Sequence, residues 1–463
     1  MSPRTVVVGG GLAGLTAALG LADRGDDVVL LEAKPRLGGL TTSFRRDSAV
    51  GPLVDDTGQH VFLRCCTDYL ALLDRLGVRG EVDLQERLTI PVARPRPGGA
   101  PVTALLRRTG LPAPAHLGAA LSRYRLLSRA DRLRVARAAL ALRRVDPAGP
   151  DTDRRSFGDW LAAHGQSPEA ITALWDLIGV AALNAPAAGA SLALAATVFR
   201  TGLLSSAGAA DIGWSRVPLG ELHGTAGRAA LEATGATVRT GVRVTALRRD
   251  GRGEDAGWVL TTREGTAAGI ELTADRVVLA VPPAAAEELA PPGTVSLAPG
   301  WAARLGAAPI VNVHVVYDRP VLDGPFLAAV DSPVQWVFDR TGPAGCHTGQ
   351  YLAVSLSAAS ELVDLPTATV ATMIVPALAD LLPAARSAQV LESFVTRERQ
   401  ATFDPAPGQA ASRPGNRTDA PGLVLAGTWT DTGWPATMEG AVRSGNAAVA
   451  ALAAPARRTA VAA

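Results

Sequence analysis

The residues of this chain best suited to a definite chemistry lie near its start, in a glycine-rich turn. Gly9, Gly11 and Gly14 follow the spacing G-x-G-x-x-G, with Leu12 and Ala13 between the second and third glycines. At this spacing the first glycine allows a tight turn, the second lets the backbone approach a pyrophosphate, and the third allows close packing of a helix on a strand. The free amides at the start of that helix attract phosphate. The turn therefore predicts a phosphate-containing ligand.

The elements around this turn must be a strand, a helix and a second strand. Thr5 to Val8 predicts a buried parallel strand, Leu12 to Arg24 a helix, and Asp27 to Leu31 a second strand. Glu32, followed by Ala33, closes the second strand, where a carboxylate can bind the hydroxyls of an adenosine ribose. A βαβ unit with its glycines and acid in these places predicts a dinucleotide site rather than a purely structural turn.

The residues that follow indicate which dinucleotide is bound. Arg36-Leu37-Gly38-Gly39 resembles the Arg-x-Gly-Gly element of flavoproteins of the amine oxidase and phytoene desaturase type. The resemblance implies that Arg36 neutralises pyrophosphate charge and that Gly38 and Gly39 admit the flavin end of FAD. Those families usually continue with Arg where this chain has Leu40, so the resemblance also implies that one cation near the flavin is absent.

The end of the chain carries a second flavoprotein signal. Ala426 to Thr430 closes a predicted strand, and Pro435 to Ala441 opens a predicted helix. In the flavoproteins that this region resembles, the helix points its N-terminus at the flavin and stabilises negative charge on the reduced ring. Many of them carry an acid where Thr428 stands. By resemblance the cofactor is FAD, and its further contacts are Gly58, Gln59, His60, Val244, Gly427, Thr428, Thr437, Met438 and Ala441.

Several further blocks resemble a narrower family, the hydroxysqualene dehydroxylases of hopanoid and squalene synthesis. They include Asp55 to His60, Ser156 to Leu161, Pro309 to His314, Ser332 to Arg340 and Trp434 to Val442. The resemblance implies reductive removal of the hydroxyl of hydroxysqualene, a C30 polyprenyl allylic alcohol, to give squalene. In that reaction protonation lets water leave, and the allylic cation takes a hydride from reduced FAD. The first block departs from the family, in which a single Asn tends to precede the glycine.

The implied reaction needs a proton donor in a dry site. Asp176 follows Trp175 at the edge of an uncharged stretch, where burial is expected to raise the pKa of its carboxyl group. His60, His314 and Asp339 are the alternative acids, and for each of the four a structural hydrogen bond is the competing interpretation. No residue pattern predicts a metal site.

The stretch from Leu177 to Ala210 contains one charged residue, Arg200, and predicts an apolar substrate tunnel. Aromatic faces can stabilise a cation, although plain core packing is the alternative for each aromatic residue. The residues expected to contact the substrate are Asn184, Tyr317, Phe326, Gln335, Trp336 and Phe338.

Positive charge is concentrated in one segment of a chain whose net charge is only +2. Arg107 to Arg144 contains ten Arg and a single acid, Asp131, interleaved with Leu. This pattern favours docking to an anionic membrane surface, with a solvated helix face as the alternative, and the small net charge predicts no nucleic-acid partner.

The expected location is cytoplasmic and peripheral, on the inner face of the cytoplasmic membrane. Three cysteines fit a reduced compartment, and the first residues do not resemble a signal peptide. The uncharged run from Leu177 to Phe199 is long enough to span a bilayer, but Asn184 and Pro186 favour a buried segment instead.

Together these signals predict an α/β fold with a Rossmann-like FAD-binding domain, a mixed-sheet substrate domain and a helical insertion, as in amine oxidases. Arg87 to Pro114 predicts a loop, about Ala115 to Arg144 one long helix, and Ser156 to Phe199 helices broken at Pro186. Val238 to Leu247 predicts a single strand. The expected segments are 1–90, 213–285 and 396–463 for the FAD-binding domain, 91–212 for the insertion, which faces substrate and membrane, and 286–395 for the substrate sheet.

Two other functions fit the same signals. The first is an oxidative enzyme, either a polyprenyl desaturase of the phytoene type or an amine oxidase. An amine oxidase often has a Lys near the flavin, and the only lysine here, Lys34, lies beside the adenosine-binding acid instead. The second is a non-catalytic flavin-binding partner that passes substrate between membrane enzymes of the squalene pathway.

Overall fold

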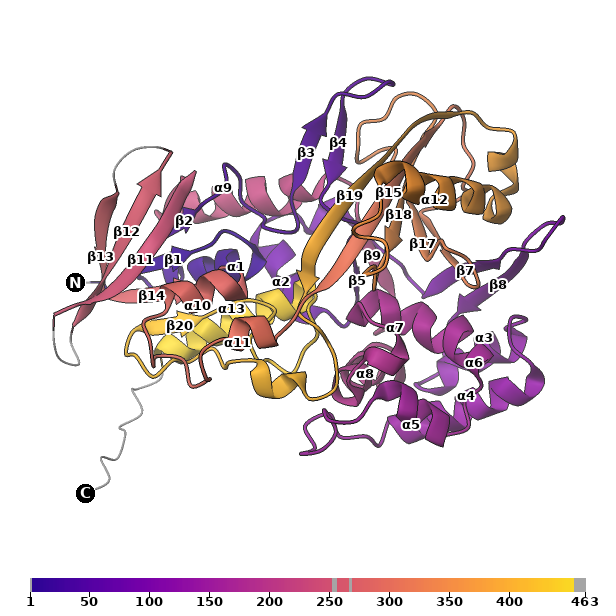
Figure 1. The fold of residues 1–463 in the computed structure, drawn as a ribbon, viewed down its shortest axis with the longest axis horizontal. Coiled ribbons are helices and arrows are strands. Elements are labelled where there is room, and N and C mark those ends of the chain that lie inside the picture. The colour runs from indigo at the N-terminus through magenta and orange to yellow at the C-terminus, as the bar shows by residue number, and fades with distance from the viewer. Residues whose placement is uncertain (1, 252–255, 266–268, 454–463) are drawn as a thin grey trace.

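The computed structural model describes residues 2–251, 256–265 and 269–453, and Figure 1 shows how its lobes are arranged. The lobe that begins the chain is built on a five-stranded parallel sheet. Its strands lie in the order β10 (Thr237–Thr240), β2 (Asp27–Glu32), β1 (Arg4–Val8), β14 (Arg276–Leu279) and β20 (Leu423–Leu425). The sheet confirms the predicted βαβ unit, in which helix α1 spans Leu12–Ala22 and ends slightly before the predicted Arg24.

Both faces of this sheet are covered, as a parallel sheet requires. Val7 faces a helical layer, whereas Val6 and Leu31 face a small antiparallel sheet. The helices are α1, α2 (Thr67–Arg75), α9 (Ala226–Ala233) and α13 (Met438–Ala453), and the small sheet consists of β11 (Val242–Asp250), β12 (Gly257–Glu264) and β13 (Ile270–Ala274). The single strand predicted over Val238 to Leu247 is wrong, because the chain turns at Gly241 and passes from one sheet into the other.

A second, mixed sheet of seven strands forms the other large lobe (Figure 1). Its order is β19 (Val390–Thr402), β15 (Ala308–Tyr317), β18 (Gln350–Leu356), β17 (Trp336–Asp339), β16 (Phe326–Ala329), β7 (Thr89–Arg94) and β8 (Val102–Arg107). Helix α12 (Thr367–Leu381) packs on one face, where it contacts alternate residues of β15 such as Val313 and Val315. The other face is turned toward the helical insertion, against which Phe326 and Phe338 pack.

Two predictions about the insertion are wrong. The loop predicted over Arg87 to Pro114 is the hairpin β7–β8, whose first strand pairs in parallel with the distant β16. β7 therefore crosses the expected boundary at residue 90 between the FAD-binding domain and the insertion. The division of the chain into five segments stays a prediction. The single helix predicted from Ala115 to Arg144 is broken at Tyr124, since its buried hydroxyl donates to the Ala173 carbonyl and Ser128 caps the next helix.

The insertion is a group of short helices beneath the seven-stranded sheet (Figure 1). They are α3 (Gly118–Arg123), α4 (Arg129–Leu142), α5 (Phe157–Ala163), α6 (Pro168–Ala170), α7 (Asp176–Leu183) and α8 (Leu192–Phe199). The predicted break before Pro186 is confirmed, because Asn184 ends α7 with a left-handed backbone at φ 60°. Within the described residues, no helix is long and apolar enough to cross a membrane.

Smaller elements connect these layers. The short strands are β3 (Ser43–Arg46), β4 (Leu53–Asp56), β5 (Val61–Leu63), β6 (Val82–Leu84) and β9 (Ile212–Ser215), and the short helices are α10 (Pro283–Leu289) and α11 (Trp301–Arg304). Single turns of other helix types lie at 79–81, 115–117, 171–175, 187–189, 200–204, 220–225, 383–386 and 409–412.

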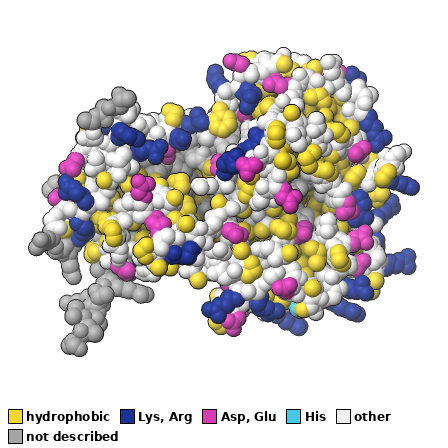
Figure 2. Space-filling model, viewed as in Figure 1, with side chains coloured by type: hydrophobic (Ala, Val, Ile, Leu, Met, Phe, Trp, Pro, Cys, Tyr) yellow, Lys and Arg dark blue, Asp and Glu magenta, His cyan; other side chains and the backbone are white. Residues whose placement is uncertain are grey.

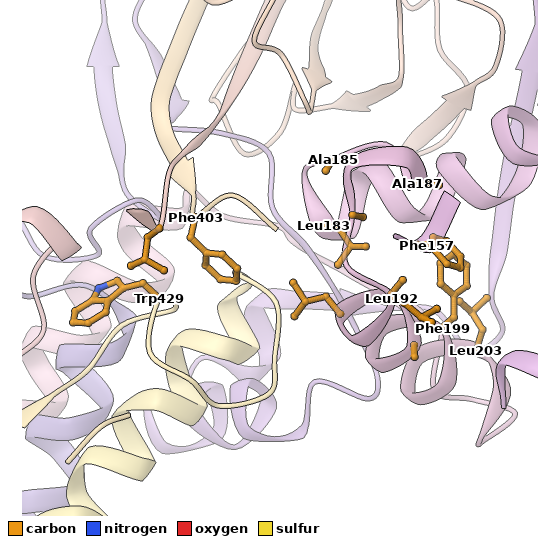
Figure 3. Close-up of a cluster of buried hydrophobic side chains, with 14 of the residues drawn as sticks. Phe157, Leu183, Ala185, Ala187, Leu192, Phe199, Leu203, Phe403 and Trp429 are labelled. Atoms are coloured by element: carbon orange, nitrogen blue, oxygen red, sulfur yellow. The ribbon is translucent and has the colours of Figure 1, made fainter. Parts of the chain in front are cut away.

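One hydrophobic core runs from the parallel sheet into the insertion. Figure 3 shows part of it, from Trp429 and Phe403 to Leu183, Phe199 and Phe157. The rings of Phe157 and Phe199 lie 5.4 Å apart, centroid to centroid. This core fixes α7, and with it Asp176, relative to the FAD-binding lobe.

Candidate functional site

The glycine-rich turn has the geometry that the sequence predicts. Gly9 adopts a φ of 109°, and a Cβ placed on it would lie 2.3 Å from the Ala280 carbonyl oxygen. A Cβ on Gly14 would lie 1.9 Å from the Gly9 oxygen, so a larger residue at either place forces the backbone apart. The amides at the start of α1, around Leu12 and Ala13, are thereby held at the end of β1, where a helix N-terminus attracts phosphate.

Glu32 lies at the end of the neighbouring strand, close to this turn. Its carboxylate accepts hydrogen bonds of 2.7 Å from the amides of Gly10 and of Lys34. The Gly241 amide donates to the Lys34 carbonyl over 2.9 Å, which places the start of β11, the strand of Val244, beside the same acid. These residues, with the exposed Ala33 between Glu32 and Lys34, fit the adenosine end of a dinucleotide.

The second glycine pair passes directly over the start of α1. The Gly38 amide donates to the Gly10 carbonyl over 2.8 Å, and a Cβ on Gly39 would lie 3.0 Å from the Gly11 Cα. The guanidinium of Arg36 lies over the Phe44 ring at 4.8 Å. Leu40, at the position where the resembled families usually have Arg, is 44% exposed. The close approach of two glycine segments leaves backbone amides and one guanidinium where a pyrophosphate requires them.

The C-terminal signal lies next to this turn because α13 packs along α1. A Cβ on Gly445 would lie 2.5 Å from the Ala13 oxygen. Gly427 and Thr428 follow β20, and Thr437 accepts a hydrogen bond of 3.1 Å from the Gly440 amide beside Met438, where α13 begins. Sequence reasoning missed one residue of the α13 start: the buried carboxylate of Glu439 accepts hydrogen bonds from the α2 amides of Asp68 and Tyr69, at 3.3 and 2.8 Å.

Two of the four candidate acids line one small cavity. Gln59, His60, Phe338 and Asp339 surround it together with Trp214, which the sequence analysis did not identify. The Nδ1 atom of His60 lies 2.9 Å from the Gly58 carbonyl, to which it is hydrogen bonded. Burial lowers the pKa of His60, so its ring is neutral near pH 7.

Asp339 uses its carboxylate to hold the protein around it. One oxygen accepts from the Thr341 amide and the other from the Gln350 side chain, each over 2.8 Å. Both oxygens therefore have a structural role, which leaves His60 as the freer of the two candidate acids in this cavity.

Four aromatic side chains, Trp214, Phe326, Trp336 and Phe338, form what we call the aromatic cluster. Phe326 lies centrally, with centroid distances of 5.7 Å to Trp214, 5.9 Å to Trp336 and 6.1 Å to Phe338. Trp214 and Phe338 line the His60 cavity, while the Nε1 atom of Trp336 donates to the Leu177 carbonyl over 3.3 Å. The cluster thus extends from the His60 cavity to α7.

Asp176 is the first residue of α7, directly before the carbonyl that Trp336 contacts. One of its carboxylate oxygens accepts a 2.8 Å hydrogen bond from the Ala187 amide. Burial raises the pKa of this carboxyl group, against the smaller effect of that hydrogen bond. A carboxyl group with a raised pKa, on a helix that contacts the aromatic cluster, can hold and deliver a proton.

His314 is enclosed by protein instead. Its two ring nitrogens lie 2.6 Å from the Tyr351 hydroxyl and 3.0 Å from the Thr396 hydroxyl, and its ring stacks on Phe394 at 4.5 Å. Burial, assisted by the charge of Arg46, lowers the pKa of His314 to about 3. With no exposed surface and both nitrogens engaged, His314 is poorly placed to protonate a substrate.

The expectation that Tyr317 contacts the substrate is corrected by the strand register. Tyr317 lies on the same face of β15 as Val313 and Val315, against α12. Trp336 and Phe338 lie on the opposite face, since their partners on β18 pair with Asn312 and His314. Tyr317 therefore cannot share a cavity with the aromatic cluster.

Asn184 and Gln335 are also engaged with protein rather than open to a ligand. The Asn184 amide donates to the Ala308 carbonyl and to the Thr402 hydroxyl and accepts from the Ala358 amide, at 2.9, 3.0 and 2.6 Å. Gln335 exchanges hydrogen bonds of 2.8 and 3.0 Å with the backbone of Ser357. Both side chains hold the turn at Ser357 and Ala358, Asn184 from the insertion and Gln335 from within the sheet lobe, and their contacts with the substrate stay a prediction.

One buried polar residue near the site was missed. Asn312 is 1% exposed, and neither atom of its amide has a hydrogen-bond partner among the described residues. A Cβ on Gly58 would lie 3.4 Å from its Nδ2 atom and 3.7 Å from the His60 ring. An Asn within the otherwise apolar run that precedes His314 was the available signal, although its direction could not be known from the sequence.

Comparison with known proteins agrees with the flavin geometry. The family model described as flavin containing amine oxidoreductase matches residues 12–453. A hydroxysqualene dehydroxylase from Rhodopseudomonas palustris is 32% identical over 97% of this chain and 98% of its own length. A zeta-carotene desaturase from Zea mays is 26% identical over 96% of this chain and 82% of its own length.

Solved structures with the same fold include amine oxidases. A putrescine oxidase superposes with a TM-score of 0.68 at 21% identity and covers 98% of this chain and 100% of its own. Cyclohexylamine oxidase from Brevibacterium oxydans gives a TM-score of 0.70 at 19% identity over 98% and 99% of the two chains. The predicted amine oxidase-like fold is confirmed, and so is FAD as the cofactor.

Proposed function

Since this chain belongs to the family of flavin-containing amine oxidoreductases and, within it, to that of the hydroxysqualene dehydroxylases, we propose that it converts hydroxysqualene to squalene. It is an FAD-dependent oxidoreductase. The observation that carries the proposed reaction is the aromatic cluster, which lies between the helix of Asp176 and the cavity of His60. Such an arrangement supports chemistry on a cation generated by an acid within an apolar site.

The proposed reaction replaces one C–O bond by a C–H bond. A proton adds to the allylic hydroxyl, water leaves with the electrons of the C–O bond, and a hydride closes the resulting cation to the hydrocarbon. Reduced FAD, when bound, supplies that hydride. The protein must therefore provide a proton, stabilise a cation and exclude water, which would otherwise add back to the cation.

Asp176 is the proposed proton donor. Because burial raises the pKa of its carboxyl group, more of it stays protonated as the pH approaches neutrality. The ring faces of Trp336 and Phe338 are the proposed stabilisers of the cation. His60 has a lowered pKa, so we assign its neutral ring to a hydrogen bond with the departing water rather than to proton donation.

A second candidate function is oxidative desaturation of a polyprenyl chain, which the full-length similarity to a zeta-carotene desaturase favours. Amine oxidation is a weaker candidate, because the only lysine, Lys34, lies beside Glu32 at the adenosine end of the site.

We also propose a cytoplasmic protein that is peripheral on the inner face of the cytoplasmic membrane, where it would meet the enzymes that make or use squalene. The support for this is the segment Arg107 to Arg144, which runs from the last residue of β8 through α3 and α4 at one edge of the molecule. In Figure 2, which has the same view, Lys and Arg side chains are frequent along that edge.

The direct test supplies FAD-loaded protein, reduced without oxygen, with hydroxysqualene in detergent. We expect squalene to form in an amount equal to the flavin that is oxidised, followed by mass spectrometry and flavin absorbance. The comparison arm gives oxidised protein an acyclic polyene without a hydroxyl group.

Squalene in the first arm and no new double bond in the second support dehydroxylation. A new double bond in the second arm with no squalene in the first establishes the desaturase instead. No change in flavin absorbance in either arm would overturn both polyprenyl reactions.

A further inference from the structure

A cavity of about 710 Å³ lies between the β7–β8 hairpin and α3, away from the flavin site. Five arginines surround it, Arg87, Arg107, Arg108, Arg123 and Arg125, and no Asp or Glu is among its lining residues. The remaining lining is largely small or apolar. A cavity with this lining is suited to an anion that carries an apolar part.

Among the residues that the structure describes, only one of these arginines is paired with an acid. Arg108 donates two hydrogen bonds to the buried carboxylate of Asp211, at 2.6 and 2.8 Å, and Arg64 donates a third at 3.0 Å. The other four cavity arginines are exposed and form no ion pair with any described residue. Four uncompensated guanidinium groups around one cavity favour a phosphate, which they can bind in bidentate fashion.

Exposed apolar side chains surround the same cavity. Leu105 lines it and is 49% exposed, while Val102 on the same edge strand and Leu111 in the following loop are 36% and 54% exposed. Leu133 and Leu140 add a further exposed pair on the neighbouring α4. Large apolar residues on an edge strand and its surroundings are unfavourable in water unless a partner covers them.

A free phosphate would account for the arginines but not for the leucines. An amphiphile accounts for both, since arginines bind its headgroup and leucines enter the region of its acyl chains. We therefore propose that this cavity is a binding site for the headgroup of an anionic phospholipid in a bilayer. This proposal rests on the proposed membrane location and adds to it the class of lipid and the residues that bind it. It does not depend on the proposed reaction.

The position of the cavity gives this docking a consequence for the site. Ala104, in the cavity lining, pairs with Val92, which pairs with Ala328, which pairs with Trp336. Ala104 shares the face of the cluster, whereas Thr103 and Leu105 of the same lining lie on the other face, so the cavity lies at the edge strand β8. Three strand spacings, or about 15 Å, separate that edge from the aromatic cluster. A bilayer bound at the cavity would lie at this edge of the sheet, three strands from the aromatic cluster.

The test compares sedimentation of the full-length, FAD-loaded protein with phosphatidylcholine vesicles that contain or lack phosphatidylglycerol. We expect binding only to the vesicles with phosphatidylglycerol. The double variant Arg123→Gln/Arg125→Gln should bind them about 30-fold more weakly, from the usual contribution of two basic residues at an anionic surface. The matched control Arg243→Gln/Arg263→Gln removes two exposed charges from β11 and β12, in the FAD-binding lobe, and should bind as the native chain does.

Two further arms separate the sources of phosphate. Dihexanoyl phosphatidylglycerol, kept below its micelle concentration, should bind the native chain at one site and compete with vesicles, whereas inorganic phosphate at equal concentration should not. FAD content and the thermal midpoint confirm that each variant is folded.

Three results would overturn the inference. They are equal binding to both vesicle types, equal loss of binding in the two double variants, or tight binding of inorganic phosphate without vesicle binding. Turnover of hydroxysqualene in detergent is measured on the same preparations, so loss of the lipid site and loss of the proposed reaction are distinguished.

Discussion

Trp336 donates a hydrogen bond through its indole Nε1 to the carbonyl of Leu177, 3.3 Å away. The contact joins β17 of the seven-stranded sheet to the first turn of α7, one residue after Asp176. It therefore holds the first turn of α7, which carries a carboxyl group with a raised pKa, against one residue of the aromatic cluster. The proposed acid, Asp176, belongs to the insertion, whereas Trp336 belongs to the seven-stranded sheet. This hydrogen bond joins the two lobes next to both residues.

Replacing Asp176 with Asn should lower turnover of hydroxysqualene by about a hundredfold or more, as expected when a general acid is lost. An Asn oxygen can still accept from the Ala187 amide, so the helix start and FAD binding should be retained. Single-turnover oxidation of the reduced flavin measures the effect. Asp159→Asn, an exposed acid in the first turn of α5, is the matched control. Equal rates in native and Asp176→Asn protein would remove Asp176 from the mechanism.

The rate of turnover should fall as pH rises, because the proposed proton donor, Asp176, has a raised pKa. The active form is protonated, so the rate is highest below the pKa in the folded protein and falls as pH rises through it. The Asp176→Asn variant should lack this alkaline decline while keeping its low residual rate. A decline of the same position and size in the variant would assign the titration to another group.

Changing Trp336 should separate ring chemistry from positioning. Trp336→Phe keeps an aromatic face and loses the hydrogen bond to Leu177, whereas Trp336→Leu loses both. If the ring stabilises a cation, the Leu variant should lose a further factor of about 5 to 30 in kcat relative to the Phe variant, with a smaller change in KM. Equal kcat in the two variants would leave Trp336 with a positioning role only.

The predictions that the structure confirms rest on residues close together in the sequence. The βαβ unit, the order of its glycines and the place of Glu32 follow from neighbours within one short stretch, and the structure has them as predicted. The hairpin β7–β8 was missed because its partner strand is remote, with Val92 paired to Ala328. A hairpin rich in Pro and Arg at the edge of a sheet has the composition of a loop, and only its pairing with β16 identifies it as two strands.

The side chains of the site were harder to predict, because their direction depends on register. Tyr317 and Trp336 are both aromatic residues in strands, but only the pairing of β15 with β18 and the covering helix α12 show that they face opposite ways. Asn184 resembled a substrate contact in an apolar stretch. Its hydrogen-bond partners lie at Ala308 and Ala358, far along the chain, and no local pattern could indicate them.

Replacing Gly14 with Ala should reduce FAD binding more than it reduces expression. Its Cβ would meet the Gly9 oxygen at 1.9 Å, so the turn must open and the helix start must move from the phosphate position. Overpacking of this kind costs about 1–3 kcal/mol of folding stability. The ratio of flavin to protein absorbance after purification measures the loss. Gly80→Ala, at a position with no atom within 4 Å of the added Cβ, is the control. Full FAD content in Gly14→Ala would contradict the assignment of this turn.

Asp211→Asn tests the stability of the hairpin beside the arginine cavity. Burial alone would raise the pKa of Asp211, but the hydrogen bonds from Arg108 and Arg64 together hold it below its usual value. Its contribution to stability is therefore present above the unfolded pKa and is lost as pH falls through the folded one.

Because Asn removes the buried anion that pairs with the partly buried guanidinium of Arg108, the free energy of unfolding should fall by about 3 kcal/mol near pH 7. Chemical denaturation of native and Asp211→Asn protein at several pH values measures this difference. The gap between them should narrow as pH falls, since protonation of the native acid imitates the substitution. A gap that stays constant down to acid pH would show that the loss comes from packing rather than from the ion pair.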